Sequence, residues 1–254
     1  MTLLHDEYDT SLFLSGLSKP TLISLDLRFK PELTNLPQPA YDFDKFWPLQ
    51  NCVALQRLVL SNAYIEDFSP LDSLLLLNEL VMSDCKVANM RSSLRASSLT
   101  SILLDRCYGP TMLMIGMIDS TEPLLAHLPS LTSLSITNSS VYQVKPLGNH
   151  PSLVNLDLSG TYVLRGVLGP LRGGWDMIGS CSNLSSLCLN YVEGLTDINW
   201  ISTLTCLTTL GLKNCTRIEN LNATLSLCPS LRDVDTSVDM HHQAERCFEL
   251  FWLC

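Results

Sequence analysis

The chain has 254 residues, of which 46% are hydrophobic and only 16% are charged. This composition is too apolar for a disordered chain, and the length suits one large domain or two small ones. The formal net charge of −9 argues against a nucleic-acid binder, because phosphate backbones are bound by clustered Lys and Arg, and equally against docking on an anionic membrane.

Residues 1–21 precede the first repeated block and are expected to cap the N-terminal edge of the domain. They carry three early acids, Asp6, Glu7 and Asp9, with no basic region before the apolar residues, unlike a secretory signal or a transit peptide. The most apolar runs, 112–118 and 74–77, are far shorter than the roughly 18 residues of a membrane helix. We therefore expect an intracellular protein in the cytoplasm.

A repeated block with the pattern L-x-x-L-x-L organises residues 22–239. Five of the eight offsets between successive blocks lie within two residues of 22, and the other three are about ten longer. The L-x-L alternation predicts a short strand with every second side chain pointing inward, and stacked units bury these side chains against each other. The nine blocks, numbered here as units one to nine from position one, begin at Leu22, Leu55, Leu77, Leu99, Leu131, Leu153, Leu184, Leu207 and Leu231.

Two further columns repeat with the blocks. The column three residues before each block is apolar and holds cysteine in three places, which predicts a core column with structural thiols. The ninth position holds a small thiol or hydroxyl in five units, at Cys85, Cys107, Ser139, Thr161 and Cys215. Cys85 and Cys107 are neighbours in this column, and we expect free thiols. Three asparagines stand one place earlier, at position eight, which leaves the register open by one residue.

The pattern matches the leucine-rich repeat L-x-x-L-x-L-x-x-N/C-x-L. Over about residues 12–240 the chain resembles the short, 22-residue intracellular class, whose best-known member is a regulatory subunit of protein phosphatase 1. It also resembles the cysteine-bearing repeats of protist and bacterial proteins. The resemblance implies an α/β solenoid, a horseshoe of about nine units with a parallel concave sheet. Apolar residues three apart, as in 64–77, predict 3₁₀ turns or short extended segments on the convex side.

Three units are too long, with inserts near 30–49, 108–124 and 162–178. Such inserts become loops or short helices on one face, often the binding face, although they can also simply pad the convex side. Residues 240–254 are predicted to form a C-terminal capping helix, because Ala244, Cys247, Phe248 and Phe251 fall on one helical face.

No catalytic motif is present: the chain has no P-loop, no G-x-S-x-G and no H-E-x-x-H sequence. His241, His242 and Cys247 do not have the spacing of a standard metal site. We expect neither a cofactor nor enzymatic activity. Positions three, five, seven and eight should face the concave surface. The candidate protein-binding residues are Tyr64, Tyr108 and Tyr162 at position ten, Asp84, Asp105 and Arg106 near the strand ends, and Trp47 and Trp175 in the inserts.

The tyrosines recur in every second unit and suit a binding rim, but they can equally pack against the neighbouring turn. The sequence favours a non-catalytic protein–protein interaction module, a scaffold subunit or an adaptor in a larger intracellular assembly. The alternative is a regulatory subunit that binds and controls an enzyme such as a phosphatase. The expected partners are proteins, with nucleic acid contacted only indirectly within a complex.

Overall fold

The computed structural model describes eleven stretches of the chain. They are residues 2–5, 19–29, 48–65, 68–87, 98–107, 128–141, 147, 150–163, 175–192, 194–219 and 221–237. The predicted helix over 240–254 and most of the three inserts lie outside these stretches.

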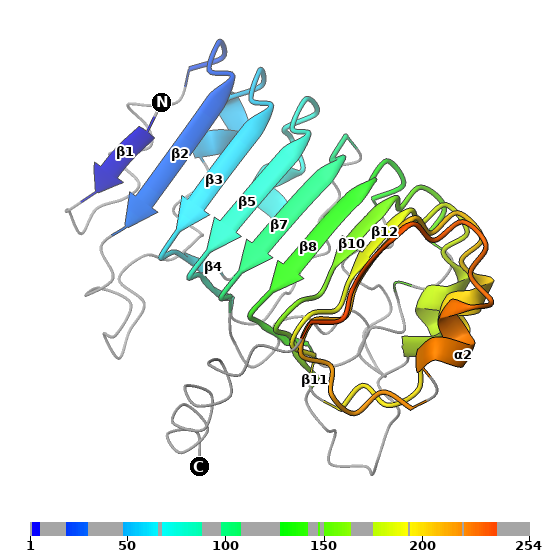
Figure 1. The fold of residues 1–254 in the computed structure, drawn as a ribbon. Helices are drawn as coiled ribbons and strands as arrows, with labels where there is room; N and C mark the ends of the chain where they lie inside the picture. The colour runs from blue at the N-terminus through cyan, green and yellow to red at the C-terminus, as the bar shows by residue number, and fades with distance from the viewer. Residues whose placement is uncertain are drawn as a thin grey trace, which may run out of the picture.

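The described residues form an open ten-stranded sheet in which each strand runs parallel to its neighbours (Figure 1). Nine strands fall in the nine predicted blocks, and each of them begins at position three of its unit. Successive units pair at identical positions, as Leu58 does with Leu80 and Leu80 with Ile102. The predicted parallel solenoid is confirmed. The nine strands are β2 (Ser24–Phe29), β3 (Arg57–Ser61), β5 (Glu79–Ser83), β7 (Ser101–Asp105), β8 (Ser133–Thr137), β10 (Asn155–Asp157), β12 (Ser186–Cys188), β13 (Thr209–Gly211) and β14 (Asp233–Asp235).

The tenth strand, β1 (Thr2–His5), was not predicted. It pairs in parallel with β2, with Leu3 opposite Leu27. It therefore supplies hydrogen-bond partners to a strand that would otherwise form the N-terminal edge of the sheet. The other edge is β14, whose Val234 is 36% exposed although it stands at the inward-facing fourth position.

The core consists of the inward-facing positions of the stacked units. From unit two to unit eight, positions one, four and six are all buried, and none of these side chains is more than 5% exposed. Burying one such side chain contributes roughly 1.5–3 kcal/mol, so the stack is stabilised by many equal contributions along its length. The predicted column three residues before each block is also buried, at Cys52, Leu74, Leu128, His150, Cys181, Leu204 and Cys228.

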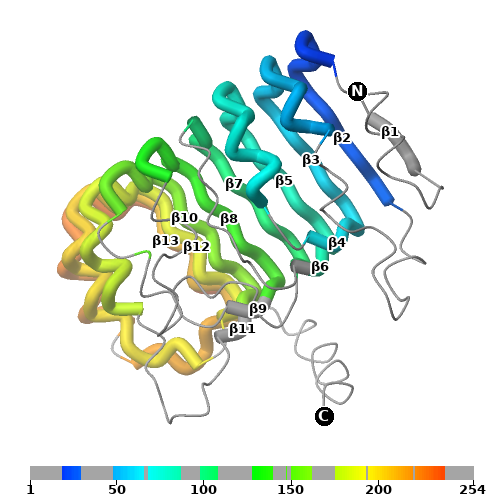
Figure 2. Tube along the Cα trace, turned by 180° about the vertical axis from the view of Figure 1, so that it is seen from behind, coloured from blue at the N-terminus to red at the C-terminus, as the bar shows by residue number. Residues whose placement is uncertain are grey.

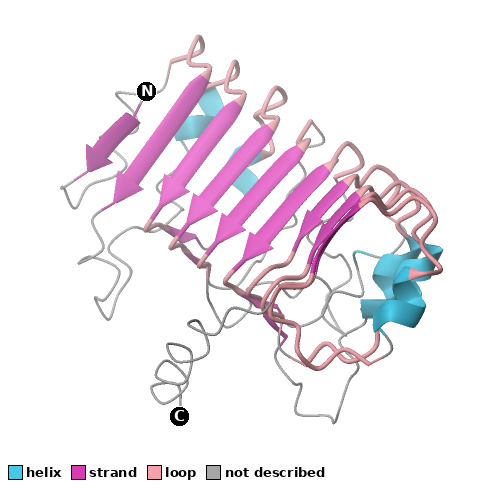
Figure 3. Ribbon diagram, in the orientation of Figure 1, coloured by secondary structure: helices cyan, strands magenta, loops and turns pink. Residues whose placement is uncertain are grey.

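The side of the sheet away from the exposed strand face carries short helices, as the three-residue rhythm predicted (Figures 2 and 3). Four of them are labelled elements, three 3₁₀ helices and one single α-helical turn, and residues 48–51 form a further 3₁₀ segment. None of the helices in the described stretches is long and apolar enough to cross a membrane. The four elements are η3 (Ser69–Leu71), η5 (Trp175–Ser180), η6 (Asn199–Thr203) and α2 (Leu221–Leu225).

A left-handed residue ends the strand segment of each unit from two to eight. The seven residues at position eight have φ between 46° and 67°, a region that favours Gly, Asn and Asp. In all seven, the position-eight N–H donates to the position-seven carbonyl of the next unit at 2.7–3.0 Å. This settles the register: position eight makes the turn, and position nine is the buried ladder. The seven residues are Asn62, Asp84, Arg106, Asn138, Gly160, Tyr191 and Asn214.

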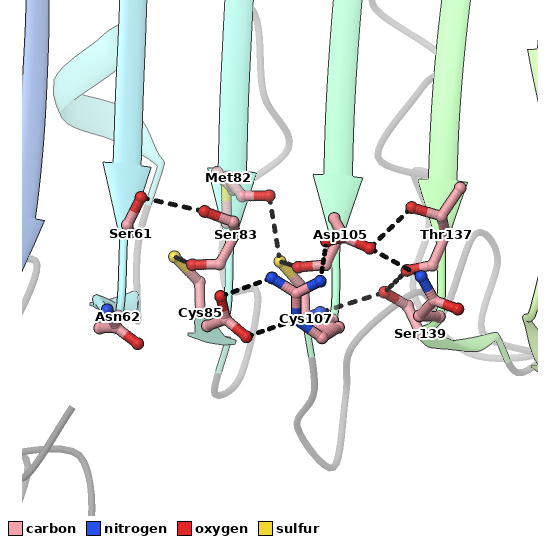
Figure 4. A network of polar contacts seen from close by, with 12 residues as sticks. Ser61, Asn62, Met82, Ser83, Cys85, Asp105, Cys107, Thr137 and Ser139 are labelled. Carbon is pink, nitrogen blue, oxygen red and sulfur yellow. Dashed lines mark hydrogen bonds and ion pairs between the residues drawn. The ribbon is translucent and has the colours of Figure 1, made fainter. Parts of the chain in front are cut away.

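The ninth position lies in the interior and satisfies the turning backbone, as predicted. The Cys85 thiol donates to the carbonyls of Leu60 and Ser83 at 3.5 and 3.3 Å, and Cys107 repeats the pattern one unit later (Figure 4). Burial raises the pKa of the Cys85 thiol well above its ordinary value. Both side chains are free thiols. After this column come two short parallel ladders, β4 (Tyr64–Ile65) with β6 (Lys86–Val87), and β9 (Ser140–Val141) with β11 (Tyr162–Val163).

Candidate protein-binding site

The concave face is built from positions three, five and seven of the strands. In β5, β7 and β8 the exposure of side chains alternates along the strand, with positions four and six buried and positions three, five and seven open to solvent. This confirms the expected orientation for positions three, five and seven. Because each strand pairs with the next at identical positions, each position forms a straight row that crosses the strands.

Three aliphatic side chains occupy position five in units two to four. Val59, Val81 and Leu103 stand directly opposite one another in neighbouring strands. Their exposure increases along the row, from 7% at Val59 to 38% at Leu103. Unit five carries Ser135 at the same position, and unit one carries Asp26. The result is an apolar row, named here for these three residues, on a face that is otherwise polar.

Paired charges border the apolar row on two sides. At position three, Arg57 Nε lies 2.7 Å from Glu79 Oε2, which joins units two and three above the row. On the unit-one side, the Arg28 guanidinium donates twice to the Asp26 carboxylate, at 3.2 and 3.0 Å. The hydrogen bonds to Asp26 raise the pKa of Arg28. Both borders are therefore electrically neutral.

The third border lies below the row, where the strands end (Figure 4). Arg106 donates to both oxygens of Asp84, at 2.7 and 2.9 Å, and its other terminal nitrogen contacts Asp105. Asp105 Oδ1 also accepts hydrogen bonds from Thr137 and Asn138, both at 2.9 Å. The hydrogen bonds to Asp84 are the main reason that the pKa of Arg106 is raised. Two carboxylates share one guanidinium, so this border keeps a net charge of about −1.

Arg106 is held in an unfavourable backbone conformation. Its φ is 46°, in the column where three other units use Asn, one uses Gly, one uses Asp and one uses Tyr. A residue other than Gly, Asn or Asp costs roughly 1–2 kcal/mol in this region. Backbone strain of this kind concentrates at functional sites. The ion pairs to Asp84 and Asp105 fix the side chain in spite of that cost.

The structure brings three of the eight predicted binding residues together, namely Asp84, Asp105 and Arg106. Tyr64 lies elsewhere, in the β4–β6 ladder, where Lys86 Nζ stands 5.8 Å from the centre of its ring. Tyr64 thus contacts the neighbouring turn, which was the alternative expectation for these tyrosines.

Two of the other predicted residues lie in elements away from this cluster. Trp175 begins η5 on the helical side and packs, half-buried, against the core beside the fully buried Ile178. Tyr162 lies in β11, where its backbone pairs with Ser140. Trp47 and Tyr108 lie outside the described residues.

The apolar row itself was missed by the sequence analysis. The signal was available, because position five holds Val, Val and Leu in units two to four but Ser, Asp, Cys and Gly in units five to eight. Position five was already expected to face the concave surface, but the run of three aliphatic residues in that column was not singled out. The structure adds that the three stand opposite one another in neighbouring strands.

The far half of the concave face offers less for recognition. Asp157 and Asp235 at position five each accept the backbone N–H two residues later, from Ser159 and Ser237, at 2.9 Å. The hydrogen bonds from Ser237 are the main reason that the pKa of Asp235 is lowered. These carboxylates close local turns, so their presence is explained by the fold.

Within the described residues, no three His, Cys, Asp or Glu side chains gather as a group that could hold a metal ion. The Cys52, Cys188, Cys215 and Cys228 thiols have pKa values raised by burial, which opposes nucleophilic reactivity.

No protein-family model matches this chain, and no curated protein matches its sequence. Solved structures do resemble it. An internalin from Listeria monocytogenes matches with a TM-score of 0.57 and 17% identity, over 88% of this chain and 63% of the internalin. The chain of TLR13 in a complex with ssRNA13 matches with a TM-score of 0.61 and 19% identity, over 92% of this chain and 31% of TLR13.

This protein has a leucine-rich-repeat horseshoe fold. At these identities the likeness extends to the fold alone. The chain spans less than two thirds of the length of either neighbour.

Proposed function

We propose that this chain is a non-catalytic protein–protein interaction module whose binding site is the apolar row together with its three charged borders. One observation carries the proposal: three aliphatic side chains line up on the concave face, with exposure rising from 7% at Val59 to 38% at Leu103, within a border of polar groups that are already paired. This arrangement matches the anatomy of protein interfaces, in which an apolar centre is enclosed by a polar rim.

The borders reduce the free-energy cost of covering this surface. An unpaired charge that is covered by a partner must lose its hydration without compensation. Here Arg57, Arg28 and Arg106 each have a carboxylate partner within this chain. A partner that covers the row therefore need not supply a counter-charge for each of these groups.

At a finer level, we propose a scaffold subunit or adaptor within an intracellular assembly. A second exposed apolar patch supports more than one contact, because Ile23, Val53, Leu75 and Leu76 are all more than half exposed. They belong to units one to three and precede the strands, on the rim above the apolar row. Single exposed leucines are ordinary, whereas these four residues come from three neighbouring units.

A regulatory subunit that controls an enzyme, as the phosphatase-regulator resemblance suggests, is the second candidate. The ion-paired borders around the row favour this candidate, because side chains fixed in this way suit one defined epitope. The RNA named in the TLR13 complex is not proposed as a ligand here. A net charge of −9 opposes binding to phosphate backbones.

The experiment compares affinity purification of the wild type with that of the double variant Val81→Ser/Leu103→Ser. Serine is what unit five carries at the same position, so the fold tolerates it. Cys188→Ser, in the same row of unit seven, is the matched control. We expect the double variant to lose the stoichiometric partner and the control to keep it, with all three proteins equally folded by circular dichroism. Retention of every partner by the double variant would exclude this site.

The two finer candidates differ in what is recovered. A scaffold subunit co-purifies with several proteins in one assembly of fixed size. A regulatory subunit co-purifies with one enzyme, whose turnover changes when the wild-type chain is added and stays unchanged with the double variant.

A further inference from the structure

The spacing of the apolar row restricts what can lie on it. Val59, Val81 and Leu103 occupy one register across β3, β5 and β7, so they follow each other at the strand spacing of about 4.8 Å. Their row runs along the stacking direction of the solenoid, across the strands. A partner element aligned with the row must place side chains at nearly the same interval.

An α-helix fits this interval and an extended strand does not. Successive turns of a helix lie about 5.4 Å apart, so the mismatch is about 0.6 Å per unit and about 1.2 Å over the three residues. Side chains on one face of a strand lie about 6.6 Å apart, a mismatch of about 1.8 Å per unit. A row of three is therefore short enough for a straight helix to stay in register.

Main-chain pairing offers an extended partner no compensation. β3, β5 and β7 are each paired on both sides, so their backbone groups are already used within the sheet. Adding a strand requires a free sheet edge, and the edges of this sheet are β1 and β14.

The borders differ in charge, and this difference fixes which side of the helix faces them. The Arg57–Glu79 border above the row is neutral, whereas Asp84 and Asp105 share only Arg106 below it. A complementary helix therefore carries Lys or Arg on the flank that faces the lower border, and uncharged polar residues on the other flank.

We propose that the partner presents an amphipathic α-helix that lies along the stacking direction over units two to four. Its apolar residues recur at i, i+3 or i+4, and i+7, with one residue of this ridge for each of Val59, Val81 and Leu103, and its basic flank faces Asp84 and Asp105. This inference rests on the proposed function, because it names the kind of segment that occupies the same site.

The test is a display selection on the full chain with two probe libraries of equal diversity. One library consists of small three-helix domains randomised on one helix face, and the other presents a randomised extended loop. Binders are then measured against Val81→Ser/Leu103→Ser, with Cys188→Ser as the matched control.

We expect the helix library to give binders that weaken at least about tenfold on the double variant and change by less than about twofold on the control. Their sequences should converge on the apolar spacing above with Lys or Arg on one flank. Asp84→Asn, which makes the lower border neutral, should remove the preference for a basic flank and reduce the dependence of affinity on salt.

Two outcomes overturn the inference in distinguishable ways. If binders that depend on the row come only from the loop library, or are helices without this spacing, the helical partner is wrong while the binding site stands. If neither library gives a binder that depends on Val81 and Leu103, the proposed function at this site also falls.

Discussion

The left-handed turn at position eight is the feature of the repeat that is most open to measurement, and Asn62 is the best place to measure it. Its φ is 56°, its N–H donates to the Ser83 carbonyl at 3.0 Å, and its side-chain amide donates to the Phe29 carbonyl at 3.0 Å. Asn62→Ala removes the side-chain hydrogen bond and also places a residue with poor left-handed propensity in the turn. Asn62→Gly removes the same hydrogen bond and keeps an easy turn.

The two substitutions therefore separate the two contributions. The lost hydrogen bond should cost about 0.5–1.5 kcal/mol in either variant. Alanine in the left-handed region costs a further 1–2 kcal/mol or so, whereas glycine costs roughly 0.5–1 kcal/mol through the entropy of the unfolded chain. We expect the alanine variant to be the less stable of the two by about 1 kcal/mol. In a chain of this length that corresponds to roughly 2–4 °C in Tm.

Urea unfolding of wild type, Asn62→Ala and Asn62→Gly at one pH measures these differences. Gln56→Ala is the control, because this exposed residue at position two has no left-handed φ, and it should change stability by less than about 0.5 kcal/mol. Equal stability of the alanine and glycine variants would refute the reasoning that the turn demands a left-handed residue.

Three further predictions follow from particular contacts. Burial lowers the pKa of His150, whose Nδ1 has no hydrogen-bond partner among the described residues, so the folded state binds fewer protons than the unfolded state. The stability of the protein should therefore fall as the pH drops through about 6.5. His150→Leu introduces the residue that three other units carry in this column, and it should abolish that loss of stability in urea titrations from pH 7 to 5. The double variant Leu75→Ser/Leu76→Asn copies the equivalent pair of residues in unit seven. Because Leu75 is 73% exposed, the variant should lower the fluorescence of a bound hydrophobic dye without lowering Tm. Unchanged dye fluorescence would contradict an accessible apolar patch. Iodoacetamide should label the exposed Cys206 long before the buried Cys85 in the native protein, and mass spectrometry showing comparable rates would contradict the buried ladder.

The sequence predicted the periodic part of this fold because each unit solves the same physical problem. Leucines at positions one, four and six have no other place to be buried than against the units on either side, so their period specifies the stack. The same reasoning located the core column that contains Cys52 and Cys181, and the ladder that contains Cys85. The 3₁₀ segments followed from a three-residue apolar rhythm.

The period of the repeat did not predict features that occur in a single unit or depend on a pair of units. β1 has only four residues and no repeat signal, and it forms because β2 offers a free edge. The sequence did not explain why the asparagines stand at position eight and not at position nine. The φ values explain it, because position eight is a left-handed turn that favours Asn whether or not its side chain joins a buried ladder. Val234 stands at a core position but remains partly exposed, because among the described strands β14 has a neighbour on one side alone.

The candidate site was likewise predicted only in part from the sequence. The sequence singled out Asp84, Asp105 and Arg106 by their place in the repeat, and a regular period already puts residues about 22 apart side by side. What tertiary structure decided is that two carboxylates share one guanidinium. It also decided that Val59, Val81 and Leu103 line up as one row on the concave face, buried at Val59 and exposed at Leu103. The place of a residue in the repeat predicts the face of the sheet that it occupies, because side chains alternate along a strand. How far each side chain on that face is covered depends on its neighbours in the adjacent strands, which only the tertiary structure shows.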